Sequence, residues 1–489
     1  MTTIKITSIC LLLIASLGSC KKWIDVKPSD RLADEQLFSS REGYLSALNG
    51  VYVELTKPEV YGENMTMTTL DVLGQYYYMS ASTHQFYQFA TFNYTGATAR
   101  TVFDNMWKKS YELIVNCNII IDKCGESSNP LLPAPYFGIV KGEALALRAM
   151  LHFDMLRLFG PIWSEENKDV PCIPYNKAPR PEVTPLLGSA AVMQHVIDDL
   201  TAAVALLKDA DPIITEGVRH EASPAGINDF YYRQYRLNYY AAKALLARAY
   251  LWKQDTGNAL REAQEILAAV MDPAHPVFKL GVLNPAAIPA DYDHMMMQEV
   301  LFALYTVNRQ NIFNAFFSPD QLATRRLSFN NNDDNQSRKN ALYDDQNDYR
   351  LKAWITQNTA SGSFLTHIKF NVGANTPAPN MIPLIRLSEV ILIAAECSPT
   401  LAEGTAYLNM LRTGMNCVSV APASSAQLKD YITLEFRKAV IGEGQMFFYY
   451  KRNAFTTVPN HASVSGTKQM QLSNYTVPLP ISEISVRGN

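Results

Sequence analysis

Seven segments of this 489-residue chain repeat their apolar residues at helical spacing, and this pattern constrains the possible fold more than any other feature. The segments are 103–123, 137–159, 190–208, 235–253, 259–270, 384–397 and 403–412. Helix-stop and turn residues follow several of them, such as Gly160-Pro161 after the second and Asp255-Thr256-Gly257 after the fourth. Helices of this length, joined in pairs by short turns, predict a mainly α fold of the helical-solenoid type.

The pair formed by 235–253 and 259–270 is the most similar to a tetratricopeptide repeat. Small residues that let neighbouring helices approach closely lie on its first helix, namely Ala241, Ala244, Ala247 and Ala249. No strict period of 34 residues runs along the chain, so helix length and small-residue placement alone support the repeat interpretation.

Loop-forming composition divides the chain into two regions. The segments 211–229, 271–297, 317–350 and 358–381 are rich in Pro, Asn, Asp, Gly and Ser, and long loops in a compact protein usually carry function. We therefore expect a helical, tetratricopeptide-like region over 20–270. A loop-rich region over 271–489, with a returning helix pair at 384–412, is expected to pack on it.

The first residues have the pattern of an export signal. Lys5 precedes an uncharged apolar run over 9–17, and Gly18-Ser19-Cys20 follows. The run is shorter than the roughly 20 apolar residues that a spanning helix needs, so 1–19 is predicted to be a cleavable signal peptide. The pattern resembles a bacterial lipobox. That resemblance implies that Cys20 becomes the first mature residue and carries the acyl chains of a stable membrane anchor.

Composition argues against several classes of function. The net charge is only −3, which does not suggest a nucleic-acid surface. Besides Cys10 and Cys20, five irregularly spaced cysteines remain, which does not suggest a disulfide framework. Cys117 and Cys124 lie seven residues apart without a histidine at ligand spacing, so two buried apolar residues are favoured over a metal pair. We expect no cofactor and no metal site.

The sequence also favours a binding protein over an enzyme. Hydrolase, zinc-protease and nucleotide-binding fingerprints are absent, and the eight histidines are scattered. The carboxylate pairs Asp198-Asp199, Asp333-Asp334 and Asp344-Asp345 are adjacent residues, which cannot face each other across a sugar as glycosidase carboxylates do. They are expected to cap helices or lie at the surface. The oxygen-rich run 330–335 lacks the glycine and distal glutamate of an EF-hand loop, so a solvated turn is favoured there, and calcium binding stays open.

A cluster of aromatic residues in polar surroundings precedes the first long helix. A sugar ring is held by an aromatic face together with hydrogen-bonding groups at its rim, and this segment supplies both. We predict that at least two of its members line a ligand site: Tyr76, Tyr77, Tyr78, Tyr87 and Asn93. The alternative is that these aromatics pack the segment onto the helices. In that case the later aromatics become the leading candidates: Tyr305, Phe316, Phe317, Tyr343 and Tyr349.

Several blocks along the chain resemble the SusD/RagB family of outer-membrane nutrient-binding lipoproteins. They are Cys20 to Pro28, Trp107 to Tyr111, Gly142 to Ala149 with Phe159-Gly160-Pro161, Pro383 to Val390, Glu435-Phe436-Arg437, and Gly442-Glu443-Gly444. These blocks span nearly the whole chain in the family's order. Gly442 and Gln445 depart from the acidic and basic residues that the family places around the Glu-Gly pair.

The resemblance implies four tetratricopeptide-like helix pairs with a loop-rich C-terminal part folded over them. It also implies a partner, a SusC-like TonB-dependent outer-membrane β-barrel. The protein is expected to face the cell exterior, capture an oligosaccharide or a peptide and deliver it to that barrel. Two other classes stay open: a surface-anchored glycan hydrolase on the same helical scaffold, and a structural adaptor without a small-ligand site.

Overall fold

The structure is a computed structural model that describes residues 35–281, 292–329, 336–359 and 362–488. The predicted signal peptide 1–19, the predicted lipid-bearing Cys20 and the asparagine-rich run 330–335 lie outside the described residues.

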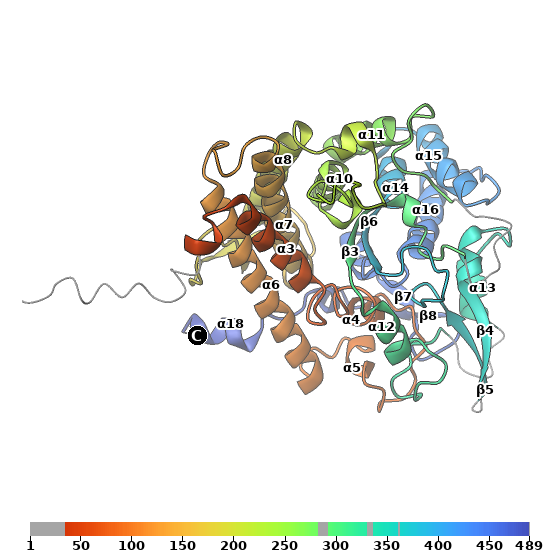
Figure 1. Ribbon diagram of the computed structural model, residues 1–489. Coiled ribbons are helices and arrows are strands. Elements are labelled where there is room, and N and C mark those ends of the chain that lie inside the picture. Colours follow the sequence, from red (N-terminus) through yellow and green to blue (C-terminus); the bar gives the residue numbers. More distant parts are fainter. Residues whose placement is uncertain (1–34, 282–291, 330–335, 360–361, 489) are drawn as a thin grey trace, which may run out of the picture.

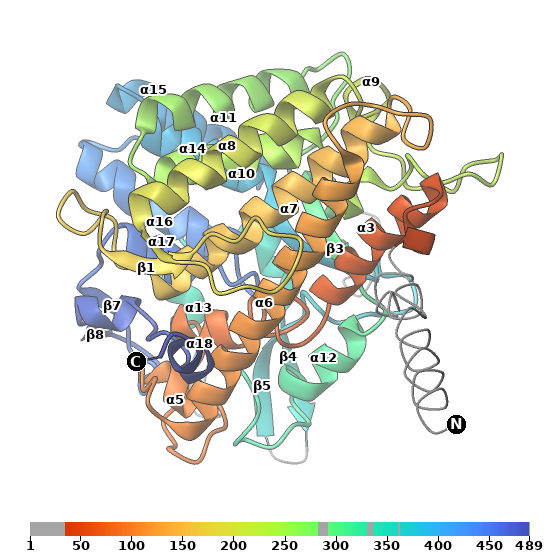
Figure 2. The ribbon, with the colours of Figure 1, turned by 90° about the vertical axis from the view of Figure 1, so that its left-hand side faces the viewer.

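A layer of long helices forms the body of the protein. In Figure 2, α6, α7, α8, α10 and α11 run side by side, and each packs against the next in chain order. α3 packs on α6, and α14, α15 and α16 continue from α11. The long helices are α3 (Arg41–Leu55), α6 (Ala97–Cys124), α7 (Tyr136–Phe159), α8 (Ser189–Lys208), α10 (Tyr239–Trp252), α11 (Thr256–Val270), α14 (Leu387–Cys397), α15 (Leu401–Gly414) and α16 (Ser425–Ala439).

The mainly helical fold is thereby confirmed, and each of the seven predicted helices is present. Two helix starts were wrong: residues 384–386 belong to strand β6 (Met381–Arg386), so that helix begins only at Leu387, and α10 begins at Tyr239 rather than at residue 235. A short buried strand and a buried helix share the same run of apolar residues, so periodicity does not separate them. The solenoid interpretation and the division near residue 270 stay predictions.

α7 lies at the centre of this layer. From Gly138 to Phe159 every residue except Lys141 is buried, as expected for a helix with neighbours on all sides. Gly138 and Gly142 allow close contact with α8, because a Cβ on either residue would lie within 3 Å of an α8 side chain or of Ala210 just beyond that helix. α8 is long and apolar enough to span a membrane, but it packs between α7 and α10 and serves as a core helix.

Enlarging an α7 alanine should destabilise the fold. Ala146 and Ala149 are fully buried, and overpacking a tight core typically costs about 1 to 3 kcal/mol. We expect Ala149→Leu to lower the melting temperature, whereas Ala205→Leu on the exposed face of α8 should leave it nearly unchanged. Thermal unfolding followed by circular dichroism tests this. A normal melting temperature with lost ligand binding would instead assign this block to the binding site.

Four antiparallel strand pairs complete the C-terminal half and the α7–α8 connection. They are β1 (Pro171–Pro174) with β2 (Leu186–Gly188), β3 (Val300–Tyr305) with β6, β4 (Trp354–Thr359) with β5 (Gly362–His367), and β7 (Thr457–Pro459) with β8 (Thr467–Gln469). The β4–β5 pair lies at the edge of the molecule away from α6 to α8 (Figure 1). β3 and β6 are apolar and almost completely buried, and they pair from Val300 opposite Arg386 to Tyr305 opposite Met381.

Short helices connect these parts. They are α4 (Thr69–Leu73), α5 (Tyr87–Ala90), α9 (Ile213–Glu216), α12 (Arg309–Phe316), α13 (Ser337–Leu342), α17 (Met446–Arg452) and α18 (Ile481–Val486), with 3₁₀ turns η3 (Arg233–Tyr235), η5 (Met297–Glu299), η6 (Tyr349–Ala353) and η7 (Leu472–Tyr475). The C-terminal α18 lies beside α6 in Figure 1, where Trp107 donates a hydrogen bond to Glu483 at 3.2 Å.

A segment near residue 71 and a segment near residue 443 also meet at a buried turn. Gly442 and Gly444 have φ of +77° and +69°, values that favour glycine, and both N–H groups donate to the Asp71 carboxylate at 2.6 and 2.9 Å. Between them, Glu443 pairs with Lys369 and Arg386. Buried ion pairs are therefore present in this block even though Gly442 and Gln445 depart from the family's pattern.

Candidate ligand-binding cleft

Tyr76 and Tyr77 are core residues. Their side chains are 1% and 3% exposed, and the hydroxyls donate to the Arg437 carbonyl at 2.7 Å and to Asp71 at 3.1 Å. A ring packed on both faces cannot stack on a sugar, so we remove these two residues from the candidate site. Tyr76 and Tyr77 instead pack their segment onto the body of the protein, which is the alternative given above.

Tyr78, Tyr87 and Asn93 reach the surface. Tyr78 is partly exposed and pairs through its backbone with Ser328, Tyr87 packs edge-on against His461, and the exposed Asn93 accepts a hydrogen bond from Thr95. Their role in binding stays a prediction. Among the later aromatics, Phe316, Phe317 and Tyr343 are buried and Tyr349 is partly buried, whereas Tyr305 is 55% exposed.

Tyr305 stands in an open cleft of about 930 Å³, a volume within the range of ligand pockets. Four segments far apart in the sequence form it: α3, the segment 220–236 that leads into α10, the stretch from η5 to the end of β3, and residues 378–380. The lining residues are Leu45, Asn49, Tyr52, Val53, His220, Asn228, Asp229, Tyr231, Tyr232, Tyr235, Arg236, Met297, Leu304, Tyr305, Ala378, Pro379 and Asn380. Tyrosine rings and side-chain amides thus meet in one concave surface.

Two buried polar residues hold the segment 231–236, which forms the tyrosine-rich wall of the cleft. Arg233 forms a two-pronged ion pair with Asp211, at 2.9 and 2.7 Å, and a further ion pair with Glu143 on α7. Gln234 donates to the carbonyls of Met297 and Val300, both at 2.7 Å. Both side chains are at most 2% exposed. Because these two residues point into the protein, their neighbours Tyr231, Tyr232, Tyr235 and Arg236 are placed along the cleft.

Backbone conformation gives an independent indication that this wall is specialised. Tyr232 has φ +55° and ψ +38°, a left-handed conformation that is unfavourable for a bulky residue. Ala378, on another segment of the same cleft, has φ +45°. Strained residues of this kind persist only where the surroundings hold them, and they are enriched at ligand sites.

The other wall carries Tyr305 and Asn380. The rings of Tyr235 and Tyr305 meet edge to face with centroids 5.4 Å apart, and Asn380 donates to the Tyr305 hydroxyl at 2.9 Å. The Arg236 guanidinium contacts two residues of α3. It lies over the Tyr52 ring, 4.5 Å from its centroid, and donates a hydrogen bond to Asn49. Tyr235 and Tyr305 are therefore oriented by these contacts, and Tyr305 stays 55% exposed.

Sequence reasoning named only Tyr305 of this cleft. It ended the polar loop at residue 229 and began the next helix at Tyr235, so Tyr231 and Tyr232 belonged to neither. The helix begins at Tyr239, where Asn238 caps it by accepting the Ala241 N–H at 3.0 Å. This asparagine cap was the available signal that 231–236 lies outside the helix.

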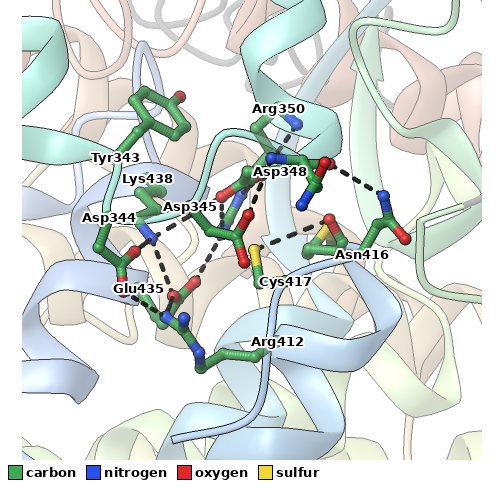
Figure 3. Close-up of polar contacts among 12 residues, drawn as sticks. Tyr343, Asp344, Asp345, Asp348, Arg350, Arg412, Asn416, Cys417, Glu435 and Lys438 are labelled. Atoms are coloured by element: carbon green, nitrogen blue, oxygen red, sulfur yellow. Dashed lines mark hydrogen bonds and ion pairs between the residues drawn. The ribbon is translucent and has the colours of Figure 1, made fainter.

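The densest cluster of charged side chains is structural (Figure 3). Glu435 pairs with Arg350 at 2.6 Å, with Arg412 at 2.7 Å and with Lys438 at 3.0 Å, and Asp344 pairs with Lys438 and Arg412. Asp345 accepts the backbone N–H groups of Asn347 and Val418, so it orders a turn and does not cap a helix as expected. Three cations face the three carboxylates of Asp344, Asp348 and Glu435, so this cluster has no unpaired acid to offer a substrate.

The cysteines agree with the sequence interpretation. Cys117 and Cys124 are buried in α6 and are free thiols, and burial raises the pKa of both to about 12. In the part of the chain that the structure describes, no group of three or more His, Cys, Asp or Glu side chains is arranged as a metal site.

Part of the chain is similar to a known protein family. Residues 22–231 match the SusD-like family model described as "Starch-binding associating with outer membrane". Over these residues, the chain is similar to the SusD-like family. A SusD-like protein of Formosa agariphila is 26% identical over 178 residues, which cover 32% of this chain and only 30% of that relative's length.

Solved structures of the SusD superfamily share the fold over most of both chains. A SusD superfamily protein of Bacteroides thetaiotaomicron has a TM-score of 0.68 at 20% identity and covers 91% of this chain and 98% of its own. A SusD-like carbohydrate binding protein of Bacteroides vulgatus has a TM-score of 0.65 at 19% identity, over 86% and 84% of the two chains. At these identities the likeness establishes the fold.

Proposed function

We propose that this protein is a lipid-anchored receptor on the outer face of the outer membrane. It captures an oligosaccharide in the tyrosine cleft and delivers it to a SusC-like TonB-dependent β-barrel. The match of residues 22–231 to a family model named for starch binding and outer-membrane association supports the general role, and a protein of the same fold is called a carbohydrate binding protein.

The tyrosine cleft is the observation on which we base the choice of binding site. Its tyrosines are held by buried anchors before any ligand arrives, and a preorganised wall loses little entropy on binding. Aromatic faces with amides at the rim match the apolar face and hydroxyl rim of a sugar. A peptide has similar requirements and is the competing ligand.

The surface-anchored hydrolase receives no support from the cleft. Glycoside hydrolysis needs two carboxyl groups on opposite sides of the scissile bond, and Asp229 is the one carboxylate among the described lining residues. Asp229 accepts a hydrogen bond from Tyr136 at 2.9 Å. The cleft thus has binding groups without an acid and base pair.

Removing the Tyr305 ring should weaken ligand binding. Loss of one stacking face is expected to cost about 1 to 3 kcal/mol, which is a five- to hundredfold weaker affinity. We would screen the full chain in detergent against immobilised oligosaccharides and a casein peptide digest, then measure affinities of Tyr305→Ala by calorimetry. Tyr407→Ala on α15, outside the cleft, is the control. Equal binding by wild type and Tyr305→Ala would place the site elsewhere, with Tyr78, Tyr87 and Asn93 as the next candidates.

Attachment to the membrane is expected to depend on Cys20 alone. Acyl chains on a single residue anchor a protein stably without a spanning helix. Cys20→Ala should release the protein from the membrane fraction of cells that lack the barrel partner, as judged by fractionation and immunoblotting. A variant that stays tightly bound to the outer membrane in those cells contradicts the prediction.

A further inference from the structure

We infer that the tyrosine cleft takes a neutral oligosaccharide rather than an acidic or sulfated one. This inference rests on the proposed function and adds the chemical class of the ligand. It follows from the charges that the cleft presents and from the way they are already used.

Fixed charges are scarce in the cleft. Among the described lining residues, Arg236 and Asp229 are the two with a permanent charge, and they cancel. Arg236 is committed to the Tyr52 ring and to Asn49, while Asp229 is exposed and would repel an anion. Burial lowers the pKa of His220 below its usual value, so this side chain is uncharged at neutral pH.

Arg219 and Arg309 lie near the cleft, and both are already engaged in other contacts. Arg219 stands over the Tyr231 ring, 4.5 Å from its centroid, and pairs with Glu216. Arg309 is 1% exposed and donates to the carbonyl of Ala378 at 2.7 Å and to that of Met381 at 3.3 Å. Those carbonyls and the chain that carries them separate the guanidinium from the cleft. A ligand in the cleft therefore meets residues 378–380 and not the charge of Arg309.

Such a surface is expected to bind an acidic glycan weakly. Each carboxylate or sulfate that leaves water needs a cation or several strong donors in exchange, and sites for these groups gather arginines and lysines. A glycan with a charge on every sugar or every second sugar would bring several anions into the cleft. The one arginine that lines it, Arg236, already contacts Tyr52 and Asn49. The desolvation of those anions would stay uncompensated.

The same cleft offers a neutral sugar both stacking surfaces and hydrogen-bonding groups. The lining tyrosines supply ring surface and hydroxyls, and lining amides stand around them. The tyrosines are Tyr232, Tyr235 and Tyr305, and the amides are those of Asn49, Asn228 and Asn380. Amides both donate and accept, which suits hydroxyl groups without favouring either sign of charge. The apolar ring faces supply most of the affinity, and this contribution does not depend on ionic strength.

The test compares two classes of ligand under two salt conditions. The full chain in detergent would be titrated with neutral hexasaccharides (glucan, xylan and mannan fragments), with hexagalacturonate and sulfated galactan hexamers, and with a casein peptide digest. We expect neutral sugars to bind, with affinity changing less than twofold between 50 and 500 mM NaCl, because there is no charge pairing for salt to screen. Tyr232→Ala should weaken that binding at least fivefold.

The other outcomes separate this inference from the proposed function. Tighter binding of an acidic or sulfated hexamer, lost in Tyr232→Ala and weakened by salt, would overturn the neutral class but leave a glycan receptor. Neutral binding that Tyr232→Ala does not change would overturn the assignment of that class to this cleft. Peptide binding without binding of any glycan would overturn the proposed function and this inference with it.

Discussion

Glu435→Gln is expected to lower the free energy of unfolding by about 3 to 5 kcal/mol, because it removes the central carboxylate of a buried cluster and leaves three cations facing the two remaining carboxylates of Asp344 and Asp348. Glu435 is fully buried and pairs with three cations, Arg350, Arg412 and Lys438 (Figure 3). Asp430→Asn on the exposed face of the same helix is the control and should change stability by less than about 0.5 kcal/mol. Urea unfolding measures both, and a loss below about 1 kcal/mol for Glu435→Gln contradicts the prediction.

The same cluster predicts how stability depends on pH. Burial alone raises the pKa of Glu435, but the charges of Arg350 and Lys438 outweigh burial, and the pKa lies below its usual value. A carboxyl with a lowered pKa stabilises the fold above the pKa of the unfolded chain, and this contribution is lost as the pH falls through the folded-state pKa. Wild type should therefore lose more stability than Glu435→Gln when the pH falls below about 4.5.

The helical layer was predictable because its signals are local. α6 and α7 carry their apolar spacing within one segment, and Gly160-Pro161 ends the second of them. Strand β6 shows the limit of this reasoning. Its run 381–386 is buried on both faces, and only pairing with β3, about 80 residues earlier, makes it a strand rather than the first turn of α14.

The binding surface was less predictable because it depends on long-range packing. Tyr76 and Tyr78 are two residues apart in similar polar surroundings, yet one is 1% exposed and the other reaches the surface. What separates them is contact with the far C-terminal part, where Tyr76 donates to Arg437. The cleft likewise combines segments near residues 50, 230, 305 and 380, and no local pattern brings these together.

One buried residue connects the stability of the fold to the shape of the cleft. Arg233 lies between Tyr232 and Tyr235 in the chain but points inward, and its guanidinium holds Asp211 and Glu143. Asp211 in turn accepts the N–H of Tyr239 at the start of α10, and Glu143 accepts the Tyr52 hydroxyl at 2.7 Å. Loss of Arg233 would release the tyrosine wall from both α10 and α3.

We therefore expect Arg233→Met to lower the free energy of unfolding by about 3 to 5 kcal/mol, since two buried carboxylates lose their cation. Glycan affinity should fall at least tenfold in protein that circular dichroism shows to be folded, although Arg233 is 2% exposed and does not line the cleft. Arg233→Lys keeps the charge but lacks the fork-shaped donor set of arginine. Its stability and affinity should therefore lie between those of wild type and Arg233→Met.

Arg148→Met separates a loss of anchoring from a general loss of stability. Arg148 forms a comparable buried pair with Asp199, at 2.7 Å for both contacts, but it joins α7 to α8 and does not line the cleft. Its loss should cost similar stability and leave affinity within about twofold, because the wall of Tyr231, Tyr232 and Tyr235 keeps its anchor. Equal affinity losses in the two methionine variants would show that binding follows overall stability, and Arg233 would then have no specific part in shaping the cleft.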